Sequence, residues 1–180
     1  MKDKFNVFLE ENGIRVDRHY TLESLLARLS FKPVFDPDIK PNEAQIQVFD
    51  CHGNYEMTNP ADFRHFILPE KQSTPDRNWT VARLLGAWIN AKVDESGKYN
   101  KHLSYLMGIK QLTTIDRPRL ASVNDIALKA MLPDELLDAV LPSDFDESDY
   151  GIIAKHFNVP IKQVAARIKQ YENNHYYMGV

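Results

Sequence analysis

The sequence predicts an α+β fold made of a small antiparallel sheet, a central helix and a pair of short helices at the C-terminus. Residues 44–49 alternate apolar and polar side chains, which is typical of a half-buried strand. The stretch from Trp79 to Ala91 is apolar on almost every side, as expected of a helix inside a core. After a boundary near residue 142, two amphipathic segments are joined by a short turn at Asn158-Val159.

The N-terminal part supplies two helices and the sheet. Apolar spacing predicts a first helix that ends at Asn12-Gly13, and a second over residues 22–30 that Thr21 caps. Three prolines in residues 33–41 predict a loop before the first strand. Residues 51–54, with the sequence CHGN, have the composition of a hairpin turn, so the strands are expected to be antiparallel.

Apolar and polar runs divide the middle of the chain. Residues 63–68 form a short apolar element, and residues 69–76 are expected to be a polar loop that leads into the central helix. Residues 98–112 are expected to form a helix or an irregular segment. Ser122 and Asp125 have the spacing of a capping box, which predicts that another helix begins at Ser122.

The central helix has the form of a zinc-peptidase helix whose functional side chains are replaced. In the motif HExxH, two His on one helical face reach one zinc, and the Glu handles the proton of the zinc-bound water. In this chain Arg83 stands at the first His, Leu84 at the Glu and Ala87 at the second His. The segment WTVARLLGAWINA resembles the core segment RFTLAHELGHYLLH of the ImmA/IrrE family of metallopeptidase-like proteins, with four further positions in register: Trp79, Thr80, Ala82 and Gly86.

Two later segments continue the resemblance in the same order. Residues 122–133, SVNDIALKAMLP, resemble the family's EANxFAAxLLMP, and Ser122 falls on the Glu that is its third ligand. The tail IAKHFNVPIKQVAARIKQ resembles the family's ALAxxFxVSxxAVxxRL. The resemblance implies a zincin-like domain over residues 1–142 and a helix-turn-helix-like appendage over residues 143–180, packed on that domain. It also implies a degenerate active-site groove at Arg83, Leu84, Ala87 and Ser122.

The resemblance implies a regulatory protein without peptidase activity. Active relatives cleave repressors of the helix-turn-helix class. A chain that keeps the groove but lacks all three ligands and the general base is expected to bind such a repressor of a phage or mobile element, as an anti-repressor or a decoy. No metal or other cofactor is expected. The six His include no pair three or four residues apart, so a peptidase would need ligands gathered from distant positions; this stays a further alternative.

Arg83 has two possible environments. Its permanently charged guanidinium would repel a cation at the vacated position. In a buried helix it would need a carboxylate or carbonyl partner, because an unpaired buried charge costs on the order of several kcal/mol. Alternatively, its side chain reaches the surface from a partly exposed face. The sequence leaves both open.

The tail gives the chain a second possible function, DNA-binding transcription regulation. Residues 151–170 carry four basic and no acidic side chains, in a chain of net charge -3. In a helix-turn-helix the second helix enters the major groove. Alternatively, these charges are only the solvent-exposed face of a packed helix pair. The acidic residues within 144–149 would also repel the phosphates of DNA. The candidate contacts to nucleic acid are Lys162, Gln163, Arg167 and Lys169, with Gln170 beside them.

Composition places the chain among soluble globular proteins, with 43% hydrophobic and 26% charged residues. The net charge of -3 predicts no global attraction to nucleic acid or to anionic membranes. Cys51 is the single cysteine, which excludes an intramolecular disulfide and a CxxC site. The N-terminus lacks the apolar run of a signal peptide, and no run of about 18 apolar residues occurs, so a cytoplasmic protein with no membrane partner is expected.

Overall fold

The structure is a computed structural model that describes residues 3–49, 63–141 and 145–176. The fold is α+β, as predicted. Its elements, in chain order, are α1 (Lys4–Glu11), α2 (Leu22–Arg28), β1 (Lys32–Asp36), the 3-10 helix η1 (Pro41–Glu43), β2 (Gln45–Val48), β3 (Arg64–Pro69), α3 (Thr74–Lys92), β4 (Tyr105–Gly108), α4 (Ile109–Leu112), α5 (Arg117–Met131), α6 (Asp134–Val140), η3 (Glu147–Asp149), α7 (Tyr150–Phe157) and α8 (Ile161–Tyr176).

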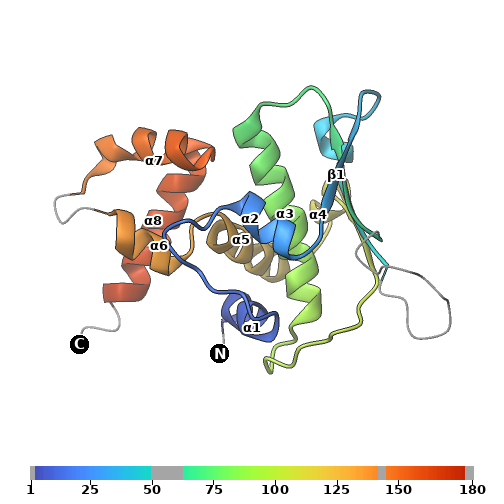
Figure 1. Cartoon of the computed structure of the whole chain (residues 1–180), viewed down its shortest axis with the longest axis horizontal. Coiled ribbons are helices and arrows are strands. Elements are labelled where there is room, and N and C mark those ends of the chain that lie inside the picture. Colours follow the sequence, from blue (N-terminus) through green and yellow to red (C-terminus); the bar gives the residue numbers. More distant parts are fainter. Residues whose placement is uncertain (1–2, 50–62, 142–144, 177–180) are drawn as a thin grey trace.

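Helix α3 runs through the middle of the molecule, as predicted for a central helix. The sheet lies on one side of it and the C-terminal helices on the other (Figure 1). Trp88 anchors the core through edge-to-face contacts with Phe8 and Phe31, at ring-centroid distances of 5.6 and 5.3 Å. Helix α5 packs directly on α3 at Gly86, where an added Cβ would lie 2.6 Å from the carbonyl oxygen of Val123.

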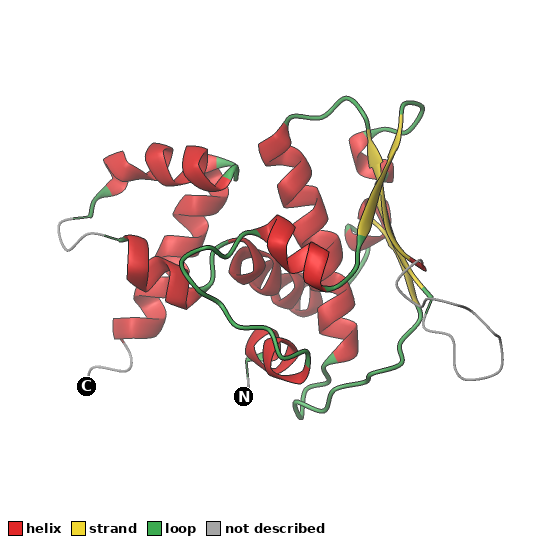
Figure 2. Ribbon diagram, in the orientation of Figure 1, coloured by secondary structure: helices red, strands yellow, loops and turns green. Residues whose placement is uncertain are grey.

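The sheet is mixed, so the prediction of an antiparallel sheet is wrong in part. Its strand order is β1-β3-β2-β4, in which β2 is antiparallel to both neighbours and β1 is parallel to β3. The chain reverses direction between β1 and β2 and again between β2 and β3. Because β3 then lies beside β1 after two reversals, those two strands run in the same direction. Figure 2 shows the sheet at the edge of the helical body.

Strand β1 occupies residues expected to be loop. The backbone N–H of Glu70 donates to the carbonyl of Asp36 at 3.3 Å. In a strand, alternate residues direct their backbone groups to the same neighbour, so from Lys32 to Asp36 every second residue bonds towards β3, and the backbone nitrogen of Pro33 points away from it. A proline is tolerated at such an outward position of an edge strand, because no ladder hydrogen bond is needed from it. Pro33 is therefore compatible with an edge strand and did not require a loop.

Two helices begin earlier than predicted. Helix α3 begins at Thr74, because the side chain of Ser73 accepts from the N–H of Asp76 and caps it. Helix α5 begins at Arg117, capped by Asp116, whose carboxylate accepts from the N–H of Arg119 at 2.9 Å. Ser122 is therefore inside α5, and the prediction that it caps a helix is wrong. Both true starts carry a proline in the first turn, where its missing N–H costs nothing.

Helices α1, α2, α7 and α8 agree with their predictions. Helix α1 is followed by Asn12 and Gly13, and Thr21 caps α2 in a reciprocal pair of bonds with Ser24. Helices α7 and α8 are joined at Asn158, which adopts a left-handed backbone with φ of 52°. The strand predicted over residues 44–49 is confirmed as β2.

Some expectations fall on residues 50–62 and 142–144. The predicted hairpin turn at residues 51–54 and the domain boundary at 142/143 both lie outside the described residues. Residues 98–112, expected to be helical or irregular, instead contain strand β4 before the short helix α4. In the described part of the chain, no helix combines the length and apolar character needed to cross a bilayer.

Candidate functional site

Two of the three positions on α3 that align with the ligands and general base of the HExxH motif face the core. Leu84 has 0% of its surface exposed and Ala87 has 3%. Both lie close to Gly86, where α3 and α5 are in backbone contact. These two side chains therefore do not line an open groove, and that part of the predicted groove is corrected. Its other members, Arg83 and Ser122, are half-buried.

Arg83 is half-buried and has no carboxylate or carbonyl partner among the described residues, which agrees with the second environment considered for it, a side chain on a partly exposed face. Its guanidinium carbon lies 6.0 Å from the centre of the Trp79 ring, one turn earlier on α3. It forms no ion pair with any described residue, and its Nε is buried without a hydrogen-bond partner there. Burial lowers the pKa of the Arg83 guanidinium from its ordinary value. The side chain is thus a half-buried cation covered by an aromatic ring.

Ser122 belongs to a different cluster, one turn beyond Ala87 along α3. Its Oγ donates to Oδ1 of Asn90 at 2.8 Å. The same oxygen accepts from the Nζ of Lys4, on α1, at 3.0 Å. Lys4 also pairs with Glu95 at 2.7 Å, although only 8% of Lys4 is exposed. An amide oxygen is not a base, so Ser122 has no group here that would activate it as a nucleophile.

This cluster lines a pocket of about 800 Å³. Its walls are the start of α1, the end of α3 with the loop that follows, and the first turns of α5. Asp116 and Arg119 contribute from α5, and Asp94 contributes from the loop. Each wall therefore contributes polar side chains, beside Ala91 and Pro118, and the pocket lies at the end of α3 remote from Arg83.

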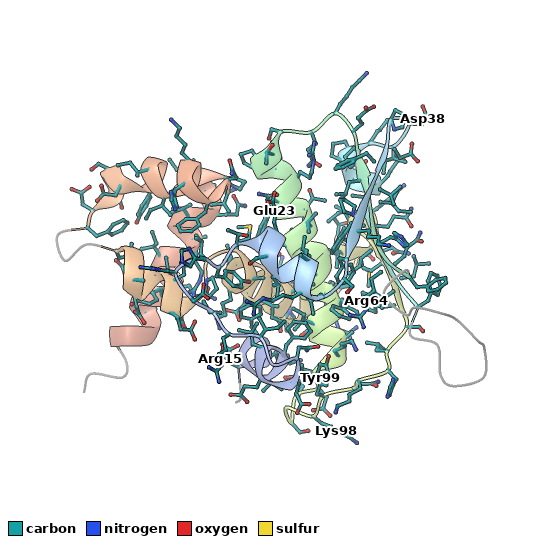
Figure 3. All side chains as sticks on the ribbon, in the orientation of Figure 1. Arg15, Glu23, Asp38, Arg64, Lys98 and Tyr99 are labelled. Atoms are coloured by element: carbon teal, nitrogen blue, oxygen red, sulfur yellow. The ribbon has the colours of Figure 1, made fainter. Side chains whose placement is uncertain are left out.

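The loop wall of the pocket is held in place from within. Asp94 accepts from the N–H and hydroxyl of Ser96 and from the N–H of Lys98, at 2.6 to 2.9 Å. These bonds, led by the Ser96 hydroxyl, lower the pKa of the Asp94 carboxyl. Lys92, almost fully buried, donates to the carbonyls that end this loop, Asn100 and Lys101. Figure 3 shows Lys98 beyond the end of α3 and Tyr99 beside α1.

Metal-ligating side chains do not gather in the described part of the chain. Across residues 3–49, 63–141 and 145–176, no three of His, Cys, Asp or Glu are placed to hold one ion. Comparison with protein-family models, with curated proteins and with solved structures finds no match to this chain. The similarity to ImmA/IrrE proteins consequently rests on the sequence segments quoted above.

The four candidate nucleic-acid contacts on α8 divide into two groups. Lys162 and Lys169 are exposed, and Gln163 is half-buried. Arg167 has 0% of its surface exposed, donates to the carbonyl oxygen of Leu132 at 2.7 Å, and pairs with Asp134. It is not available to DNA, so its inclusion among the contacts is wrong.

Arg167 instead attaches the tail to the rest of the fold. Three further bonds act in the same way: Gln170 to Asp125, Tyr171 to Asp138, and Asn78 to the carbonyl of Asn158. The tail thus packs on helices α5 and α6. The available signal that Arg167 faces inward was its position in the helix, three residues after Val164 and directly before Ile168, both of which are apolar.

The sequence did not single out three residues of the pocket: Lys4, Asn90 and Arg119. Asn90 interrupts the apolar run of α3, which is a weak signal by itself. Lys4 and Arg119 carry no local signal, because what they share is a cavity formed by elements far apart in the chain.

Proposed function

We propose that this chain is a catalytically inactive, peptidase-like regulatory protein that binds a protein partner. The proposed partner is a helix-turn-helix repressor of a phage or mobile element, which the chain would sequester as an anti-repressor or decoy. The observation that carries the proposal is the replacement of three ligands and the general base. The substitutes are Arg83, Leu84, Ala87 and Ser122, in segments that otherwise follow the ImmA/IrrE pattern.

The environment of these positions supports a binding role over a catalytic one. Leu84 and Ala87 fill the core, where neither can move a proton or hold a metal. The hydroxyl of Ser122 donates to an amide oxygen. What is accessible near these helices is a polar pocket whose walls are fixed by internal hydrogen bonds, and a pre-formed surface of this kind favours binding.

The test is capture of the partner from the source organism, with this chain as bait. We expect a DNA-binding regulator to be recovered at its full mass, and we expect the purified chain to release it from its operator DNA. Recovery of no such regulator, or of a regulator cut at a peptide bond, would overturn the proposal.

A DNA-binding function remains the second candidate because of two exposed lysines. Lys162 and Lys169 are seven residues apart on α8, so they share one face of the helix. A mobility shift at low salt that disappears in the Lys162→Glu, Lys169→Glu double variant would favour this function. Absence of a shift at low salt would remove it.

A further inference from the structure

Asn90 lines the pocket, and the orientation of its side chain leaves the amide nitrogen Nδ2 without a partner among the described residues. The ammonium of Lys4 can only donate, so the atom of Asn90 that faces it must be the oxygen. The hydroxyl of Ser122 donates to the same oxygen. Nδ2 therefore points the other way, and it donates to no group of the residues that the structure describes. Its two protons are free to meet a ligand.

Arg119 supplies further donors to the same pocket. It is exposed and lies three residues before Ser122, so the two side chains share one face of α5. Its guanidinium forms no ion pair with any of the described residues. By contrast, each carboxylate of the pocket already accepts a hydrogen bond within the chain: Glu95 from Lys4, Asp94 from its own turn, and Asp116 from the first turn of α5. Each of these bonds uses one carboxylate oxygen and leaves the other without a partner among the described residues, whereas Arg119 and Asn90 are donors of the pocket whose side-chain N–H groups have no such partner.

We propose that this pocket is a carboxylate-binding site, in which the guanidinium of Arg119 and the amide of Asn90 receive a carboxylate of the partner protein. A planar guanidinium matches a carboxylate through two parallel hydrogen bonds, which gives direction as well as attraction. The surrounding Asp94, Glu95 and Asp116 favour a singly charged group over a phosphate, because they repel a group that carries nearly two charges more strongly than a carboxylate. They also suit basic side chains next to the bound carboxylate in the partner.

The ligand's carboxylate belongs to an acidic side chain or to a chain end. Both sources present the same group to Arg119. The inference that the ligand is part of a protein rests on the proposed function. The inference that the site binds a carboxylate does not depend on it.

Titration followed by 1H–15N NMR tests the site directly. The probes are the peptide acetyl-Gly-Gly-Glu-Gly-Gly-amide, the peptide acetyl-Gly-Gly-Gly-Gly-Gly with a free C-terminus, and a control in which Gln replaces Glu and the end is amidated. We expect saturable shifts of the Asn90 side-chain amide and of the Arg119 Nε–H signal with a carboxylate peptide, and none with the control. The peptide that binds more tightly identifies the source.

Two arginines in the first turns of α5 provide a matched pair of variants. Arg119→Glu is expected to weaken binding of the carboxylate peptide by about tenfold to a hundredfold, the usual effect of a charge-assisted hydrogen bond. Arg117 is also exposed but does not line the pocket, so Arg117→Glu is expected to change the affinity less than about twofold at physiological salt. Arg119→Gln, which matches Glu in size but carries no charge, separates the loss of the guanidinium from repulsion by the added carboxylate.

Three results would overturn the assignment. The first is equal shifts with the control peptide, and the second is equal weakening by the two charge reversals. The third is tighter binding of inorganic phosphate than of either carboxylate peptide. Capture of a repressor equally well by the wild-type and Arg119→Glu chains would remove this pocket from the interface and leave the proposed function standing. If the chain bound the carboxylate peptide but captured no regulator, the pocket assignment would stand and the proposed function would fall.

Discussion

The contact at Gly86 makes a quantitative prediction about the α3–α5 crossing. An alanine Cβ there would lie 2.6 Å from the carbonyl oxygen of Val123 and 3.2 Å from the backbone nitrogen of Ala127. Ordinary contacts of a Cβ begin at 3.4 Å, so the two helices would have to separate by about 0.8 Å at this point. Neither atom can rotate away, because both belong to the backbone.

Two opposing terms set the size of the effect. Gly→Ala inside a helix stabilises it by about 1 kcal/mol. Overpacking a dense core costs about 1–3 kcal/mol, and a clash with backbone belongs at the upper end. We therefore expect Gly86→Ala to lower the free energy of unfolding by about 2 kcal/mol, which corresponds to a fall in Tm of about 4–8 °C for a chain of this size.

Gly151 provides the control, and urea unfolding provides the assay. Gly151 is in α7 with nothing within 4 Å of an added Cβ. Gly151→Ala is expected to be neutral or to stabilise the chain by up to about 1 kcal/mol. If Gly86→Ala proved as stable as the wild type, the close approach of α3 and α5 would be wrong.

Charge and pH supply further predictions. Asp134→Ala leaves the guanidinium of Arg167 buried without its carboxylate, so we expect the free energy of unfolding to fall by about 3 kcal/mol. The control Glu135→Ala, in the same first turn of α6, is expected to lower it by less than about 0.5 kcal/mol. Equal losses in the two variants would refute the pairing of Asp134 with Arg167. Burial raises the pKa of Tyr20 above its ordinary 10.0. Burial alone would lower the pKa of Lys129, but hydrogen bonds and attraction to two acidic neighbours together raise it. A raised pKa gives stability that is fully present below the unfolded value and is lost as the pH rises towards the folded value, so the free energy of unfolding should fall as the pH rises above about 10. Tyr20→Phe should flatten that fall, and an unchanged slope would contradict it.

The sequence predicted those parts of the fold that depend on local patterns. The apolar run of α3, the cap at Thr21 and the turn at Asn158 each follow from neighbouring residues. The start of α3 could also have been found, since Ser73 and Pro75 have the positions of a cap and a first-turn proline. The loop over residues 69–76 is predicted from their polarity, although Ser73 and Pro75 indicate the start of a helix.

Features that depend on distant residues could not be predicted in the same way. Strand β4, with the sequence YLMG, does not alternate apolar and polar residues, and it is defined by its pairing with β2. The burial of Arg167 depends on Leu132 and Asp134, more than thirty residues earlier. The pocket between α1, α3 and α5 likewise exists only once the helices have packed.

The metal content of the untagged chain, purified without chelator and measured by elemental mass spectrometry, tests the central claim most directly. At the positions that align with the metal ligands of the ImmA/IrrE pattern, this chain has an arginine, an alanine and a serine: Arg83, Ala87 and Ser122. We predict far less than one zinc per chain, even after incubation with zinc and dialysis. About one tightly held zinc per chain would contradict the account and would assign the protein to the metal-dependent peptidases with ligands elsewhere in the sequence.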